Sequence, residues 1–135
     1  MLDLTIHHLC IQTNDYTASY SFNCQVLGAK LVKETPNFHN RAFNSWLQLP
    51  NLLIELQTPK QPSHFHDFSK TTQGIAHFCF LVPDVTLAVA QIQATGYHHF
   101  QTKNKQIIYD VEGSLLAKII APEGTIIELR DQAQL

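Results

Sequence analysis

The feature that most constrains the fold of this chain is an internal repeat. In each half a histidine is followed two residues later by a cysteine and seven residues later by an aspartate, beginning at His8 and at His77. A helical pattern that ends at a glycine comes next, and a later strand pattern carries the triplet Ile-Glu-Leu, at 54–56 and at 127–129. A module that occurs twice in this way predicts two similar structural units, each with one histidine and one glutamate in matching places.

Size and composition limit the alternatives. The 135 residues are enough for one compact domain, or for two very small halves that share a core. The formal net charge of −2 argues against a nucleic-acid partner, and no apolar run reaches the ~20 residues of a membrane helix. The first residues lack the basic and apolar segments of a secretory signal. Three cysteines without a Cys-x-x-Cys pair do not indicate a disulfide framework, so we expect a cytoplasmic protein with reduced thiols.

Hydrophobic periodicity predicts the order βαβββ in each copy. Aspartates that can cap a helix and glycines that can end one bound the two predicted helices, at Asp15 to Gly28 and at Asp84 to Gly96. Strands are predicted at residues 5–12, 29–35, 41–49 and 52–58 in the first copy, and at 75–82, 105–112, 115–121 and 125–130 in the second. We expect turns at Pro36-Asn37, Pro50-Asn51 and 122–124. The modules are therefore placed at 1–58 and 74–135, with a linker at 59–73.

Several motifs carry a family resemblance over nearly the whole chain. They are the opening Ile-His-His-Leu-Cys-Ile at 6–11, Val-Leu-Gly at 26–28, Leu-Ile-Glu-Leu at 53–56, Ala-His-Phe-Cys-Phe at 76–80 and Ala-Pro-Glu-Gly-Thr-Ile-Ile-Glu-Leu at 121–129. With these motifs the chain resembles the vicinal oxygen chelate superfamily, which includes glyoxalase I, methylmalonyl-CoA epimerase, extradiol dioxygenases and fosfomycin or bleomycin resistance proteins. The resemblance implies a single α+β domain over 1–135, in which two βαβββ modules form a cupped mixed sheet around a divalent metal. This is the glyoxalase/bleomycin resistance/dihydroxybiphenyl dioxygenase fold.

The ligand pattern is most similar to that of glyoxalase I (lactoylglutathione lyase), and by motif position it implies His8, Glu55, His77 and Glu128 as metal ligands. The residues themselves support this prediction, because an ionised carboxylate between isoleucine and leucine is costly to bury without a partner. Two imidazoles and two carboxylates suit Zn, Ni, Co, Mn or Fe and leave room for water or substrate. Taken singly, a strand histidine or glutamate is more often structural. The match across two copies favours the metal site.

Other residues are weaker candidates for contact with a substrate. Cys10 and Cys79 face the same side as the ligands, where we expect them to pack rather than act as nucleophiles. Gln12 stands where many glyoxalase I members have an arginine that helps hold glutathione, so the identity of any thiol stays open. Arg130 should share the face of Glu128, which makes it our candidate for binding an anion.

The resemblance implies a glyoxalase-like lyase or isomerase that acts on a small 2-oxoaldehyde adduct or related hydroxy-carbonyl compound. Its reaction would move a proton between neighbouring carbons through a metal-bound enediolate, with Glu128 as the base and Glu55 as the alternative. Two other functions stay open at this point, a non-catalytic protein that binds small molecules and an acyl-CoA epimerase. We expect a homodimer, since half-sheets leave unpaired edges, and each site could draw on one chain or on two.

Overall fold

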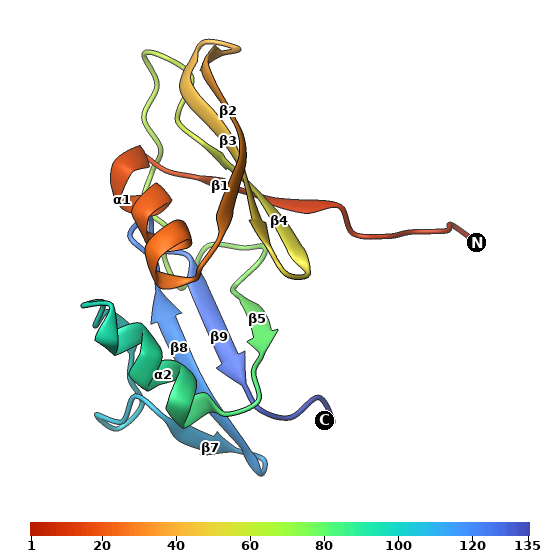
Figure 1. The fold of residues 1–135 in the computed structure, drawn as a ribbon, viewed down its shortest axis with the longest axis vertical. Coiled ribbons are helices and arrows are strands. Elements are labelled where there is room, and N and C mark those ends of the chain that lie inside the picture. The colour runs from red at the N-terminus through yellow and green to blue at the C-terminus, as the bar shows by residue number, and fades with distance from the viewer. The chain divides into compact units, whose positions relative to one another are not determined.

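The computed structural model describes residues 1–135 and contains two compact units, Met1–His66 and Asp67–Leu135 (Figure 1). The boundary between the units falls inside the predicted linker, residues 59–73. Each unit contains one mixed sheet and one helical segment, so the chain is an α+β protein with two sheet modules. None of the helices is long and apolar enough to span a membrane.

The first unit contains a four-stranded sheet with the strand order β1-β4-β3-β2. Its strands are β1 (His8–Gln12), β2 (Lys30–Phe38), β3 (Arg41–Leu49) and β4 (Leu52–Gln57). β1 runs parallel to β4, whereas β4–β3 and β3–β2 are antiparallel. A parallel pair requires a crossover connection, which here contains α1 (Tyr16–Ser21) and the π-helix η1 (Phe22–Val26).

Sequence features set both ends of this helical segment. The Asp15 carboxylate accepts a hydrogen bond from the backbone N–H of Ala18 at 3.1 Å and so satisfies one free donor of the first turn. Gly28 has φ +80°, a left-handed conformation that glycine adopts without steric cost. The segment covers the sheet face on which the fully buried apolar side chains of β3 and β4 lie, namely Leu47, Ile54 and Leu56.

The second unit repeats this plan with one additional short strand. Its elements are β5 (Phe78–Leu81), α2 (Val85–Ala94), β6 (Phe100–Gln101), β7 (Tyr109–Val111), β8 (Ser114–Ile120) and β9 (Ile126–Arg130). The strand order is β5-β9-β8-β6, with β7 also paired to β8, and β5 is parallel to β9. The Asp84 carboxylate caps α2 through the N–H of Leu87 at 2.9 Å. The core of this unit consists of Val85, Val89, Ile92, Ile119, Ile127 and Leu129.

Two predicted strands begin later than expected. β1 begins at His8 rather than at residue 5, and β5 begins at Phe78 rather than at 75. The register explains the first case, because His8 pairs with Leu53 and β4 itself begins at Leu52. Residues before His7 therefore extend past the end of their only partner strand. In the second unit the pairing likewise begins at Phe78, opposite Ile127.

Two other expectations were wrong. The predicted turn at Pro36-Asn37 lies inside β2, and the chain turns instead at His39 and Asn40, which have φ values of 46° and 67°. The proline is tolerated because β2 is an edge strand, where a missing N–H leaves no partner unsatisfied. The strand predicted at 105–112 is shortened to β7, because the chain before it makes a turn closed by the Lys103–Gln106 bridge; the short strand β6 precedes this turn.

Candidate metal centre

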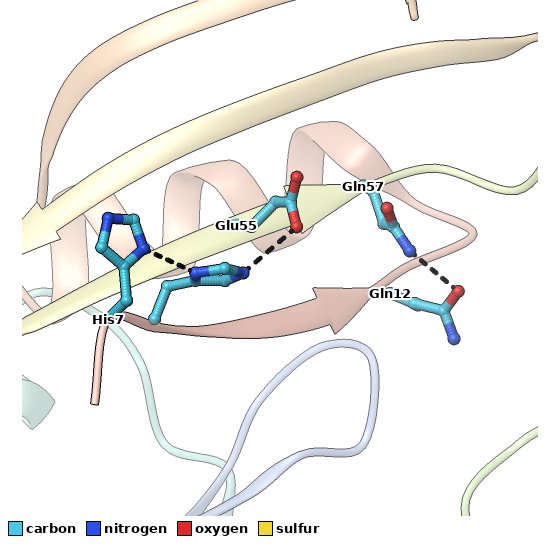
Figure 2. A network of polar contacts seen from close by, with 5 residues as sticks. His7, Gln12, Glu55 and Gln57 are labelled. Carbon is cyan, nitrogen blue, oxygen red and sulfur yellow. Dashed lines mark hydrogen bonds and ion pairs between the residues drawn. The ribbon is translucent and has the colours of Figure 1, made fainter. Parts of the chain in front are cut away.

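In the first unit, His8 and Glu55 lie together on the face of the sheet opposite α1. The parallel register of β1 and β4 places Cys10 directly opposite Glu55 and His8 one pair further along the same face. The His8 Nε2 and Glu55 Oε1 atoms are 3.7 Å apart (Figure 2). Both side chains are partly accessible, at 33% for His8 and 17% for Glu55, so a small ion or molecule can reach them.

Two neighbours hold the imidazole of His8 in place. The Nδ1 atoms of His7 and His8 are 2.8 Å apart, a hydrogen-bond distance, and this contact is the dashed line that begins at His7 in Figure 2. The Trp46 ring meets the His8 ring edge to face, with 4.8 Å between their centroids. With Nδ1 occupied in this way, Nε2 is the nitrogen directed at Glu55, and partners of this kind orient histidines that bind metals.

The second unit contains the equivalent pair, His77 and Glu128. Their Nε2 and Oε1 atoms are 3.8 Å apart, and their side chains are 36% and 10% exposed. The parallel register of β5 and β9 places Cys79 directly opposite Glu128, just as Cys10 lies opposite Glu55. The repeat that is visible in the sequence is therefore also a repeat of local geometry.

The glutamates influence the two cysteines of the repeat, which lie directly opposite them. Desolvation raises the pKa of Cys10 to about 11, and the Glu55 carboxylate, which accepts from the thiol and repels a thiolate, adds to the rise. Desolvation likewise raises the pKa of Cys79 to about 12, with Glu128 in the same supporting role. Thiols that stay protonated at neutral pH are poor nucleophiles, and both cysteines are exposed in the structure, so the expected packing role stays a prediction.

Gln12 belongs to a row of amides beside the first pair. The Gln57 Nε2 donates a hydrogen bond to the Gln12 Oε1 at 3.0 Å (Figure 2). Asn44 lies opposite Gln57 on β3, is 2% exposed, and its Oδ1 has no hydrogen-bond partner. This part of the first unit therefore presents neutral polar groups rather than a cation.

We call the faces that carry these residues the site faces. The site face of the first unit comprises His8, Cys10, Gln12, Asn44, Trp46, Glu55 and Gln57, and that of the second unit comprises His77, Cys79, Leu81, Tyr109, Leu116, Lys118, Glu128 and Arg130. Sequence analysis missed Trp46 and Lys118, which lie directly opposite Glu55 and Glu128. A signal was present, because each position is related to its glutamate by the predicted turn at Pro50-Asn51 or at 122–124.

Each pair fits a divalent metal in its donor chemistry. Ligand atoms that lie ~2.0–2.2 Å from one ion are at most about 4.4 Å from each other, and both observed separations are shorter. Within either unit, however, only one imidazole and one carboxylate meet, and the structure contains no cluster of three or more His, Cys, Asp or Glu side chains that could hold a metal ion. That all four residues bind one and the same ion therefore stays a prediction.

A hollow lies elsewhere in the first unit, at the tip of the β2–β3 hairpin. It has a volume of about 240 Å³ and is lined by Asn37, Asn40, Arg41 and Gln61. Arg41 there donates a hydrogen bond to the Thr58 carbonyl at 2.7 Å, which fixes its guanidinium. None of the predicted site residues lines this hollow.

Known proteins share both the sequence pattern and the fold. The protein YaeR of Escherichia coli (strain K12), described as uncharacterized, is 32% identical over 97 residues, which cover 66% of this chain and 69% of YaeR. The glyoxalase family protein from Enterococcus faecalis has a similar structure, with a TM-score of 0.76 and 22% identity over 94% of this chain and 97% of that one. The fosfomycin resistance protein FosX from Listeria monocytogenes, complexed with Mn(II) and sulfate ion, gives a TM-score of 0.70 and 12% identity over 98% of this chain and 95% of that one.

These two structural likenesses concern the fold alone, and a family model adds evidence from the sequence. The model of the Glyoxalase/Bleomycin resistance protein/Dioxygenase superfamily matches residues 5–113, which include the whole first unit from Thr5 and the His77 motif of the second. Particular closeness to glyoxalase I stays a prediction. The chain belongs to the Glyoxalase/Bleomycin resistance protein/Dioxygenase superfamily.

Proposed function

We propose that this protein is a divalent-metal-dependent enzyme, a glyoxalase-like lyase or isomerase acting on a small 2-oxoaldehyde adduct or related hydroxy-carbonyl compound. The observation that carries the proposal is the matched pair of His–Glu contacts, 3.7 Å and 3.8 Å long, on the site faces of the two units. The Mn(II) complex of FosX, a member of the same fold, supports a divalent metal in general.

His8, Glu55, His77 and Glu128 would hold the ion together. When bound, such an ion acts as a Lewis acid that polarises a carbonyl and makes the adjacent C–H more acidic. His8 is suited to stay a ligand throughout the reaction, because His7 and Trp46 fix its ring. The glutamates are suited to a second task, since a carboxylate can bind an ion or carry a proton.

Glu128 is the group that we assign to proton transfer. It would take a proton from one substrate carbon on a carboxylate oxygen and return it to the neighbouring carbon, so that the reaction is an isomerisation without net proton release. Glu128 is only 7% exposed, and exclusion of water keeps such a proton from exchanging with solvent. Glu55 is the more accessible of the two carboxylates and is the alternative base.

Matched glutamine substitutions test this assignment. We expect Glu128→Gln to lower turnover by about 10²–10⁴-fold, the usual contribution of general acid–base catalysis, with a much smaller loss of metal. Glu55→Gln is expected to reduce turnover less. Turnover would be screened first on methylglyoxal with several thiols, and bound metal would be counted in the same preparations.

Two outcomes would contradict the proposal in different ways. A Glu128→Gln variant that keeps its metal and near-normal turnover would make Glu128 a ligand only. A wild-type protein that binds metal tightly but turns over neither 2-oxoaldehyde adducts nor acyl-CoA substrates would instead be a small-molecule-binding member of the superfamily. Turnover of an acyl-CoA substrate alone would identify the epimerase alternative.

A further inference from the structure

We propose that Lys118 and Arg130 form an anion-binding subsite beside Glu128, so that the substrate carries a carboxylate or phosphate group close to its reacting carbons. The inference rests on the proposed function, since it names the substrate class of the same site. It concerns the second unit only, and it follows from register, burial and charge on that unit's site face.

The first step is the placement of the two cations around Glu128. Lys118 on β8 pairs directly with Glu128 on β9, so the side chains of these two residues leave the sheet on the same face as neighbours. Arg130 lies two residues after Glu128 on the same strand and therefore also shares its face. One carboxylate is thus flanked by two basic side chains, across the sheet and along the strand.

The second step is that neither cation forms an ion pair with a protein carboxylate, although Glu128 is their neighbour. The ion pairs of this unit join His77 to Glu128 but do not include Lys118 or Arg130. The Arg130 Nε is buried and has no hydrogen-bond partner. A buried charged donor without a partner is costly, and an anion bound to the guanidinium would remove that cost.

The third step is the character of the surrounding surface. Arg130 pairs with Leu116 on one side and with Leu81 on the other, so apolar side chains flank its cationic group. Coulombic attraction is stronger beside such low-polarity walls than in open water. Tyr109 pairs with Leu116 and so lies on the same face as Arg130.

The fourth step is the contrast with the first unit. The position that corresponds to Lys118, directly opposite the glutamate, is Trp46, and the position that corresponds to Arg130 is Gln57. The site face of the first unit therefore offers an anion no basic side chain at these two places. At these two positions, only the second unit offers a cation to an anionic substrate.

Binding of three small probes to the metal-free full-length protein tests the subsite apart from metal and turnover. The probes are glycolate, 2-phosphoglycolate and the neutral glycolamide, and affinity would be measured by NMR titration. We expect at least one anion to bind more tightly than glycolamide. Lys118→Met and Arg130→Met should each lower the affinity for that anion by about 10- to 100-fold, the range for hydrogen bonds to charged groups. Lys70→Met, which removes an exposed cation of the same unit, should change nothing.

The outcomes separate the two possible sources of the anion and also the two proposals. Preference for 2-phosphoglycolate would indicate a phosphorylated substrate, and preference for glycolate a carboxylate. Lys118→Arg keeps the positive charge and should retain anion binding. If the Arg130 variant does not fold, the difference in anion affinity between Lys118→Arg and Lys118→Met tests the subsite alone. Anions that bind no better than glycolamide, or an anion affinity that Lys118→Met leaves unchanged, would overturn the subsite. Either result would leave the Glu128 assignment intact. Anion binding without any metal-dependent turnover would retain the subsite and reject the proposed function.

Discussion

The two units of this protein have the same plan and the same His, Cys and Glu positions, but they differ in the side chains beside them. In the first unit Glu55 lies between Cys10 and Trp46, and the adjoining row consists of amides. In the second unit Glu128 lies between Cys79 and Lys118, and the adjoining row contains Arg130 and leucines. The comparison shows which positions the repeated scaffold keeps and which have diverged. The candidate ligands belong to both units, whereas charge that could select a substrate belongs to one.

The largest expected effect on metal binding tests whether the two histidines are equivalent. We expect His8→Ala and His77→Ala each to weaken binding of one and the same ion by about 10²–10³-fold, because four-ligand zinc sites provide about 10–16 kcal/mol in total. Competition with a chelator would give the affinity, and elemental analysis the stoichiometry. His98→Ala, at an exposed position of the second unit, is the matched control.

The stoichiometry also distinguishes a joint site from two separate ones. Two ions in the wild-type protein, with one lost in each variant, would mean that each unit binds its own metal. Unchanged affinity in His77→Ala would remove that residue from the ligand set.

A smaller effect, on stability, tests whether the aspartate caps at the two helix starts are equivalent. Asp15→Ala and Asp84→Ala each remove a carboxylate that accepts from a first-turn amide, at 3.1 Å and 2.9 Å. Each substitution should lower the free energy of unfolding by about 0.5–2 kcal/mol, measured by urea denaturation, and replacement by Asn should restore most of it. A loss in only one variant would show that the two caps are not equivalent.

The smallest effect is a pH dependence of stability above pH ~10, and it concerns the residue that follows each helix-ending glycine. This residue is Ala29 in the first unit and Tyr97 in the second, where the hydroxyl donates to the Ile120 carbonyl at 2.5 Å. Burial, with the negative charge of Glu123 as a lesser cause, raises the pKa of Tyr97 to about 12, against about 10 in an unfolded chain. The folded state therefore holds this proton more tightly, and the associated stability is complete below pH ~10 and lost as the pH rises towards ~12.

Thermal melts of wild type and Tyr97→Phe between pH 9 and 12 would measure this contribution. The difference in melting temperature between the two proteins should shrink across that interval. A constant difference would mean that Tyr97 contributes through packing alone.

Much of the fold could be predicted from local sequence, because the signals were local. Asp15, Gly28, Asp84 and Gly96 bound the helical segments as expected, and the alternation around Ile54-Glu55-Leu56 placed two side chains in the core and one on the site face. Strand starts were harder to predict, since β1 begins where its partner β4 begins, and that depends on register rather than on the residues of β1.

In the candidate site, too, residues in local motifs could be predicted, whereas residues placed by strand pairing could not. The pairs His8–Glu55 and His77–Glu128 followed from a repeated motif, and the structure brings each pair within 4 Å. Lys118 and Trp46 were not predicted, because neither residue type signals a site by itself. Their importance arises from the antiparallel pairing that places them opposite a glutamate.

The π-helix of the first unit has a consequence for how the two halves correspond. Gly28 follows Asp15 by 13 residues, whereas Gly96 follows Asp84 by 12, so the first helical segment is one residue longer. η1 accommodates the extra residue through a wider turn, in which the Leu27 N–H bonds to the Phe22 carbonyl five residues back. An alignment of the two helical segments therefore needs its gap within Phe22–Val26. A gap elsewhere in the helix would rotate the following residues by about 100° and mismatch their buried faces, which matters to anyone who exchanges the two modules to build a hybrid.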